Sequence, residues 1–331
     1  MDAACTELLL DAGAETEVTD SQGQRPLHVA ARQQDAANLN LLLGKSADTA
    51  PKTNDGDSAL HLAAENSDEA CVRPLLEAGA PINEPNTDEN SPLHLSCQRD
   101  AIDVVRLFIE FGADTETANN QGETPLLIST EHADTQSVEA LLHAGSNPDA
   151  IKNDGQAALH LAALNGTDAI EVLRMLLHGR GGTEGADHNV QNGDGDTALH
   201  IVVRQQDHEC VELLLEEGAE ARAIVNNEQD APLHVAAANS DPQCVQMVLD
   251  YGADPNAGNS AGDTALHISV RNRDTESTTK LLTAEPTPHR RRCHPSAANG
   301  DGDTALHIIA KYGDKEGAGP HNMDYNPTRW P

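Results

Sequence analysis

Aromatic residues are scarce in this 331-residue sequence, which contains two Phe, three Tyr and one Trp. A hydrophobic core therefore has to be built from Leu, Val, Ile and Ala, which suits thin layers of packed helices. Apolar runs are also short, since none approaches the roughly 20 residues that a membrane-spanning helix needs. The segment Met1-Asp2-Ala3-Ala4 lacks the basic residues of a secretory signal. From these absences we expect a protein that is neither inserted into a membrane nor secreted.

Basic residues are few as well. Lys and Arg together number 21 against 54 Asp and Glu, which gives a formal net charge of −33 with histidine neutral. A surface with this charge repels the phosphates of nucleic acids and the head groups of anionic lipids, and it attracts basic segments. We therefore expect a partner protein with a basic segment, and neither nucleic acid nor a membrane surface.

A four-residue pattern such as Ser91-Pro92-Leu93-His94 recurs along the chain. We call the first residue of each copy the anchor. The anchors are Arg25, Ser58, Ser91, Thr124, Ala157, Thr197, Ala231, Thr264 and Thr304, at steps of 33, 33, 33, 33, 40, 34, 33 and 40 residues. A period of this length is typical of a solenoid, in which each repeat buries apolar surface only against its neighbours.

Each repeat predicts two helices. Ser or Thr stands at six of the nine anchors and Pro follows four of them, a pattern typical of an N-cap and a first helical turn. An aspartate ten residues after the anchor is placed to cap a second helix, at Asp35, Asp68, Asp134, Asp207, Asp241, Asp274 and Asp314. Glycines such as Gly79 follow that helix, and turns such as Asn54-Asp55-Gly56-Asp57 separate the repeats.

These features resemble the ankyrin-repeat family. The anchor pattern matches the family signature, and His61-Leu62-Ala63-Ala64 and Leu75 to Ala80 recur in phase with it. The resemblance implies an all-α ankyrin-repeat α-solenoid, with helix-turn-helix units joined by β-hairpin-like loops. We assign residues 1–24 to a partial repeat, 25–303 to eight repeats with insertions at 168–184 and 283–295, 304–315 to a partial repeat and 316–331 to a disordered tail. The partial repeats suggest a fragment of a longer array.

Histidines recur at one position of the repeat, three residues after the anchor. They are His28, His61, His94, His160, His200, His234, His267 and His307. Packed helices lie about 8–10 Å apart, whereas a zinc ion needs ligands about 2 Å from a common point, so this spacing argues against a metal site. The family resemblance implies that each imidazole instead holds a loop by hydrogen bonds.

The cysteines also follow the repeat. Cys5, Cys71, Cys210 and Cys244 share one position, which predicts small buried apolar residues with free thiols in a reducing compartment. Cys293 with His289 and His294 is interleaved with three arginines, which repel a divalent ion.

Two further segments carry unusual charge. The acidic turn from Asn192 to Asp196 lacks the glycine and the glutamate that a calcium loop has at positions 6 and 12. Arg290-Arg291-Arg292, in the second insertion, is interpreted as an exposed docking or nuclear-import sequence, or as an intramolecular partner of the acidic face. No phosphate-binding loop or nucleophile motif occurs. We therefore predict no catalytic, cofactor-binding or metal-binding residues, and no cofactor.

Ankyrin repeats usually bind proteins through their hairpin tips and the inner face of the first helices, so the resemblance places partner-binding residues there. At the tips we predict an acidic ridge formed by Asp55, Asp57, Glu123, Asp154, Asp194, Asp196, Asp263, Asp301 and Asp303. On the first helices we predict a basic stripe formed by Arg32, Arg99, Arg204, Arg271 and Lys311.

The sequence thus predicts a non-catalytic scaffold or adaptor that binds partner proteins in the concave groove of an ankyrin-repeat stack. We expect a monomer that acts in the cytoplasm or the nucleus. One alternative is a regulatory or substrate-recruiting arm of a larger multidomain enzyme or membrane channel. Another alternative is an acidic cation-binding protein. Calorimetry that detects no heat of calcium binding would exclude it.

Overall fold

The computed structural model describes residues 3–179, 184–222, 224–287 and 290–312. The chain divides into two compact units, one that ends at Ile201 and one that begins at Val202. The predicted disordered tail, residues 316–331, lies outside the described residues.

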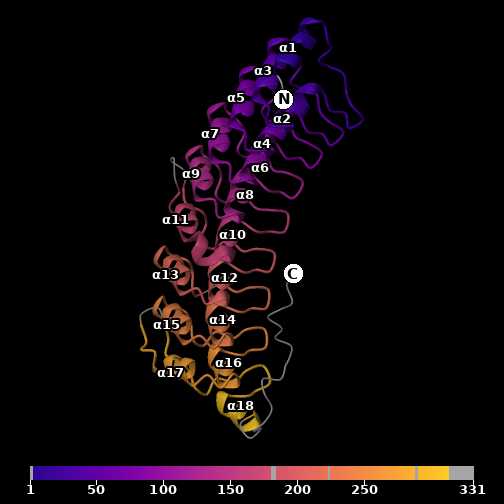
Figure 1. Cartoon of the computed structure of the whole chain (residues 1–331). Helices are drawn as coiled ribbons and strands as arrows, with labels where there is room; N and C mark the ends of the chain where they lie inside the picture. Colours follow the sequence, from indigo (N-terminus) through magenta and orange to yellow (C-terminus); the bar gives the residue numbers. More distant parts are fainter. Residues whose placement is uncertain (1–2, 180–183, 223, 288–289, 313–331) are drawn as a thin grey trace. The chain divides into compact units, whose positions relative to one another are not determined.

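Two layers of helices make up the first unit (Figure 1). The first helices of its repeats are α2 (Pro26–Arg32), α4 (Ala59–Glu65), α6 (Pro92–Cys97), α8 (Pro125–Glu131) and α10 (Ala158–Asn165). The second helices are α1 (Ala3–Asp11), α3 (Ala36–Gly44), α5 (Glu69–Glu77), α7 (Ile102–Glu110), α9 (Thr135–His143) and α11 (Ile170–His178). Within each layer every helix packs on the next, and loops project beside the first helices. The predicted all-α class is confirmed.

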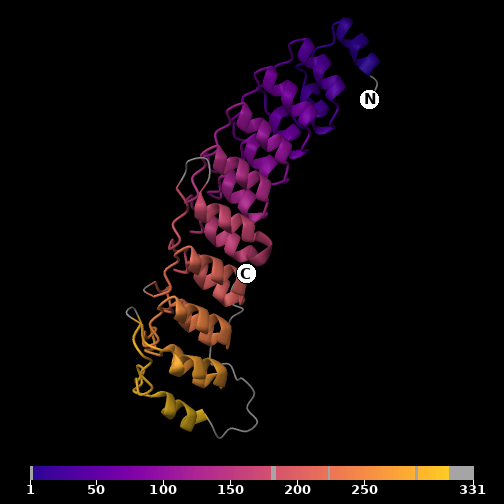
Figure 2. The same cartoon turned by 90° about the vertical axis from the view of Figure 1, so that its left-hand side faces the viewer.

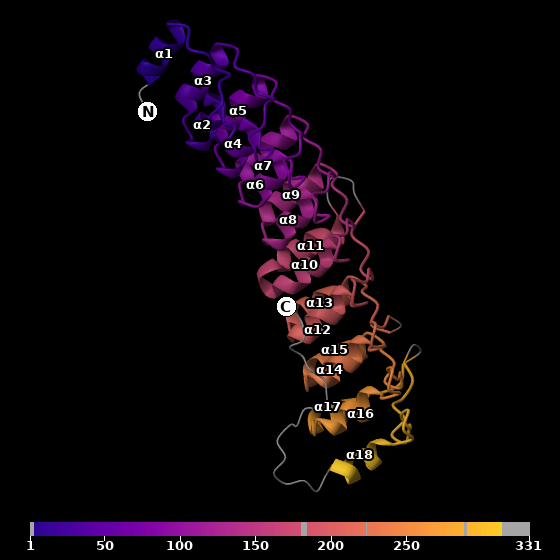
Figure 3. The same ribbon diagram turned by 90° about the vertical axis from the view of Figure 1, so that its right-hand side faces the viewer.

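The second unit repeats this arrangement. Helix α12 (Ala198–Gln205) spans the division between the units. It is followed by α13 (His208–Glu216), α14 (Pro232–Ala238), α15 (Pro242–Asp250), α16 (Ala265–Arg271), α17 (Thr275–Thr283) and α18 (Ala305–Tyr312). Helices α14, α16 and α18 form one layer and α13, α15 and α17 the other. For the first unit, Figure 2 looks onto the second helices, and Figure 3 onto the opposite side, with the first helices and the loops.

The core is aliphatic, as the composition predicts. Phe108 is fully buried in α7, while Phe111 and Tyr251 are exposed. Apart from Phe108, the buried apolar side chains of the described residues are Leu, Val, Ile, Ala, Met, Cys and Pro.

Aspartate capping explains where the second helices begin. The side chain of Asp134 accepts hydrogen bonds from the backbone N–H groups of Gln136 and Ser137, at 3.2 Å each. The same cap is present at Asp35, Asp68, Asp207, Asp241 and Asp274. Six of the seven predicted caps are therefore confirmed, and Asp314 lies outside the described residues.

The residue before each capping aspartate adopts a left-handed backbone conformation. Ala133 has φ of 55°, and Gln34, Ser67, Gln206, Ser240 and Arg273 have φ between 54° and 60°. A side chain with a Cβ atom makes this conformation unfavourable by roughly 1–2 kcal/mol. The turn between the two helices tolerates this strained residue because the capping aspartate that follows fixes the start of the second helix.

Replacing Ala133 with glycine should therefore stabilise the protein by up to about 1 kcal/mol. The matched control is Ala144→Gly at the end of α9, where φ is −75°. There, glycine only adds backbone freedom to the unfolded chain, so it should destabilise by about 0.5–1 kcal/mol. Chemical denaturation of the two variants measures both effects, and a destabilised Ala133→Gly protein would contradict this account of the turn.

The first insertion is placed differently from the prediction. A short 3-10 turn, Gly166–Ala169, precedes α11, which begins at Ile170, thirteen residues after the anchor Ala157. The other second helices begin eleven residues after their anchors, as α13 does at His208. Two extra residues are thus accommodated ahead of the second helix, and the range assigned to the insertion, 168–184, includes α11 itself.

Candidate protein-binding surface

The histidines three residues after the anchors, which we call the anchor histidines, hold the loops, as the family resemblance implies. The Nδ1 atom of His61 accepts the backbone N–H of Ser58 at 3.1 Å, so the ring hydrogen is on Nε2, which donates to the carbonyl of Asn90 at 3.1 Å. His28, His94, His160 and His234 make the equivalent pair of bonds. Burial lowers the pKa of His28, His61, His94 and His160, although the loop carbonyl opposes this shift. These four imidazoles are neutral structural groups.

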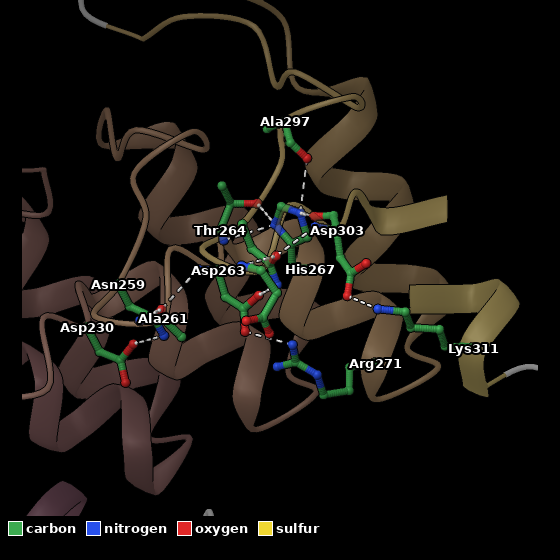
Figure 4. Close-up of polar contacts among 12 residues, drawn as sticks. Asp230, Asn259, Ala261, Asp263, Thr264, His267, Arg271, Ala297, Asp303 and Lys311 are labelled. Carbon is green, nitrogen blue, oxygen red and sulfur yellow. Dashed lines mark hydrogen bonds and ion pairs between the residues drawn. The ribbon is translucent and has the colours of Figure 1, made fainter. Parts of the chain in front are cut away.

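In several loops an asparagine joins neighbouring tips. In the second unit, Asn259 Oδ1 accepts the backbone N–H groups of Ala261 and Asp263, both at 3.1 Å, and its Nδ2 donates to Asp230 at 2.8 Å (Figure 4). Asn299 donates to Asp263 at 2.7 Å in the same way. Asn86 and Asp57 form this bond in the first unit, at 2.9 Å. The tip carboxylates therefore act as hydrogen-bond acceptors that connect consecutive repeats.

The predicted acidic ridge is only partly exposed. Asp55, Asp154 and Asp301 are exposed, and Asp57, Asp194 and Asp303 are half-buried. Three residues of the predicted ridge are buried: Glu123, Asp196 and Asp263 are 7%, 5% and 5% exposed. Asp263 is buried where Asn299 of the next repeat donates a hydrogen bond to it. Glu123 is buried where it accepts a hydrogen bond from Asn119 and forms an ion pair with Lys152.

Lys152 bridges two carboxylates of the first unit. Its Nζ lies 2.8 Å from Glu123 Oε1 and 3.0 Å from Glu131 Oε2. Burial acts to lower the pKa of Lys152, but the hydrogen bonds to both glutamates outweigh it and raise the pKa above its ordinary value. The lysine therefore keeps its charge and compensates the buried Glu123.

All five residues of the predicted basic stripe are exposed, and three of them form ion pairs. Arg271 pairs with Asp263 at 2.7 Å, and Lys311 pairs with Asp303 (Figure 4). Arg99 pairs with Glu65 at 3.0 Å. Arg32 and Arg204 are the other two exposed residues. The stripe thus neutralises part of the ridge, which the sequence prediction treated as a separate surface.

A groove of about 710 Å³ lies in the first unit, between loops and the first helices α4, α6 and α8. Its carboxylates are Asp57, Glu65, Asp88, Glu123 and Glu131, and its only arginine or lysine is Arg99. The rest of the lining is six amide side chains, Leu95, Ile128 and His132. The groove therefore presents negative charge and hydrogen-bonding groups to a ligand.

The structure places only some of the predicted residues in this groove. Asp57, Glu123 and Arg99 line it. Sequence reasoning missed Glu65 and Glu131, which stand seven residues after their anchors. Arg32, Arg204 and Arg271 of the predicted basic stripe stand at the same position of the repeat, so its acidic members belong to the same face of the first helices.

The arginine-rich insertion is not a wholly exposed sequence. Arg290 is 6% exposed, and its guanidinium donates to the carbonyls of Leu249 and Glu285. Leu249 lies in the last turn of α15, whose carbonyls lack partners within the helix. The docking interpretation is therefore wrong for Arg290, which ties the insertion to α15. Arg291 and Arg292 are exposed, and His289 lies outside the described residues.

The cysteines match the prediction with one exception. Cys71, Cys97, Cys210, Cys244 and Cys293 are buried free thiols. Cys5 is also a free thiol, but it is exposed, because the part of α1 that the structure describes buries none of its residues. Burial raises the pKa of Cys97 and Cys210 to about 12 and that of Cys293 to about 11.

The comparisons agree with these repeats. A family model described as ankyrin repeats in three copies matches residues 2–86, 69–152, 93–183 and 159–259. The chain belongs to the ankyrin-repeat family. Ankyrin repeats are generally protein-protein interaction modules and are typically non-catalytic. A search of curated proteins finds no match. Among the described residues of this ankyrin-repeat protein, no helix has both the length and the apolar character needed to cross a membrane.

Proposed function

We propose that this ankyrin-repeat protein is a non-catalytic scaffold that binds the basic segment of a partner protein in the acidic groove of its first unit. The observation that carries the proposal is the groove lining, whose five carboxylates outnumber its arginine, Arg99, and the adjoining Lys152, which pairs with Glu123 and Glu131. Lysine and arginine side chains of an extended segment would find carboxylates at several points along the groove. The exposed amide side chain of Gln121 can accept and donate hydrogen bonds to the backbone of the same segment, whereas those of Asn86, Asn119 and Asn120 already bond within the loops.

Electrostatic attraction supports the groove as the place where a basic partner first binds. The chain carries a net charge of −33, so its field attracts a positive segment before contact. The spacing between neighbouring repeats is close to the Debye length, which is about 8 Å at physiological salt. Charges on adjacent repeats therefore act together, whereas charges farther apart are screened from one another. A partner that binds this way associates faster at low salt.

We also propose that the protein acts in the cytoplasm or the nucleus and that it is a monomer. Free thiols at all six cysteines support a reducing compartment. The net charge of −33 supports the monomer, since it repels a second copy. Cell fractionation and light scattering test the two statements.

Neutralising groove carboxylates tests the proposal. The variant Asp88→Asn/Glu131→Gln removes two charges from exposed groove residues. Its control, Glu77→Gln/Glu110→Gln, removes two exposed charges from the second helices α5 and α7, outside the groove. Quantitative capture from cell extract should give a set of basic proteins that the wild type and the control retain and that the groove variant loses.

The expected loss is on the order of tenfold in affinity, because two charge-assisted contacts contribute about 0.5–1 kcal/mol each at a solvent-exposed surface. Circular dichroism confirms that each variant is folded. Partners retained equally by the groove variant and the control would contradict binding in the groove.

A further inference from the structure

Three side chains with metal-binding chemistry meet in the second unit, away from the groove. His208 begins α13, Asp241 caps α15 and Cys244 lies in the first turn of α15. One ligand atom from each lies within 4.8 Å of the other two. The closest pair is His208 Nε2 and Asp241 Oδ2, at 2.9 Å. A nitrogen, an oxygen and a sulfur ligand are thus brought to one place.

Burial leaves this cluster open on one side. Cys244 is fully buried, and the side chain of Asp241 is 6% exposed, whereas that of His208 is 37% exposed. The imidazole is therefore the solvent-exposed member of the cluster. Asp207 also acts on Cys244 electrostatically, so the cluster carries negative charge from two aspartates. This charge favours a divalent cation.

We propose that His208, Asp241 and Cys244 bind a zinc ion, a site that lies outside the proposed partner groove. Zinc is held by histidine nitrogen, carboxylate oxygen and cysteine sulfur at about 2.0–2.3 Å, and a tetrahedral arrangement keeps ligand atoms about 3.5 Å apart. Small side-chain rotations reach this geometry from separations of at most 4.8 Å. Water occupies the fourth position.

Proton and charge balance are consistent with this site. Zinc binds the Nε2 lone pair of the neutral imidazole, whose proton then resides on Nδ1, and it displaces the thiol proton of Cys244 to solvent. The ion with one carboxylate and one thiolate has no net charge, which suits a largely buried position. Asp241 keeps its capping role, since its Oδ1 accepts the N–H groups of Gln243 and Cys244 at 3.0 and 3.1 Å.

The array contains its own comparison for this site. The same aspartate and cysteine recur as Asp68, which caps α5, and Cys71, which is buried in its first turn. The residue that corresponds to His208, eleven residues after the preceding anchor, is Ala36 at the start of α3. The aspartate and cysteine therefore have a structural role without metal, and His208 supplies the third ligand.

Cobalt absorbance tests the assignment, because Co²⁺ replaces zinc and gives a thiolate charge-transfer band only when cysteine sulfur is bound. The reduced full-length protein should bind one equivalent with this band, and zinc should displace it. His208→Gln and Cys244→Ser should each weaken binding by more than about 100-fold, because losing a ligand costs more than the roughly 10–100-fold that follows the loss of a hydrogen-bond partner behind a ligand. Cys210→Ser changes a buried cysteine at the same repeat position and should leave binding unchanged.

The converse experiment transplants the site. Ala36→His places a histidine beside Asp68 and Cys71, and it should add a second equivalent that Cys71→Ser removes. The absence of a band from the wild-type protein would overturn the proposal. A band that His208→Gln and Cys244→Ser leave unchanged would also overturn it, as would one that Cys210→Ser removes equally from a folded protein.

Discussion

The free energy of unfolding should fall by several kcal/mol when the pH is lowered from 7 to 5. Burial lowers the pKa of His28, His61, His94 and His160 below the ordinary value of 6.5. Below pH 6.5 the unfolded chain therefore binds more protons at these positions than the folded chain does. Their stabilisation is complete above pH 6.5 and is lost as the pH falls. Each histidine contributes at most about 1.4 kcal/mol per pH unit, so that the four together contribute at most about 5.6 kcal/mol per pH unit.

Thermal unfolding followed by circular dichroism at pH 7, 6 and 5 measures this effect, and the midpoint should fall at each step. The chain offers a matched control, since Leu127 already occupies the anchor-histidine position of one repeat. His94→Leu should lower stability at pH 7, because the N–H of Ser91 and the carbonyl of Glu123 lose their partner. It should also reduce the pH dependence. A midpoint that does not change between pH 7 and pH 5 would contradict neutral, buried histidines.

Replacing Lys152 with methionine should destabilise the protein by about 3 kcal/mol. The substitution keeps the length of the side chain but removes the charge that compensates Glu123, whose carboxylate is buried. A buried charge that loses its partner costs about 3–5 kcal/mol, and the lower end applies because Asn119 also donates to Glu123, at 3.0 Å.

A double-mutant cycle separates this effect from lost packing. Adding Glu123→Gln to Lys152→Met should recover at least half of the loss, because the uncompensated charge is then absent. Glu131→Gln alone should cost less than about 1 kcal/mol, since Glu131 is exposed. The measurement is chemical denaturation at neutral pH. Equal stability of Lys152→Met with and without Glu123→Gln would show that the ion pair is not the cause.

Local sequence signals were sufficient to predict the repeat and its helices. The capping aspartates and the first-turn prolines such as Pro92 act within a few residues of where they stand, and the structure confirms both. The anchor histidines were also predictable, since the family resemblance implied their loop contacts. The strained backbone at Ala133 was not, because the residue that fills a left-handed position carries no signal when it is not glycine.

Contacts between repeats account for what the sequence did not reveal. Whether a tip aspartate is exposed depends on an asparagine in the next repeat, as Asn299 shows for Asp263. Arg290 is buried because the insertion folds back onto a helix that ends 40 residues earlier, at Asp250. His208 and Cys244 stand 36 residues apart, and each has an ordinary role within its own repeat. Their proximity arises only when the repeats stack.

The central claim is that negative charge in the groove of the first unit binds a basic segment. Its most direct test is the association rate of a captured partner as a function of ionic strength, for the wild type, Asp88→Asn/Glu131→Gln and Glu77→Gln/Glu110→Gln. We predict a rate that falls as salt rises, with a clearly weaker dependence in the groove variant than in the control. A rate independent of salt, or the same dependence in all three proteins, would contradict the account.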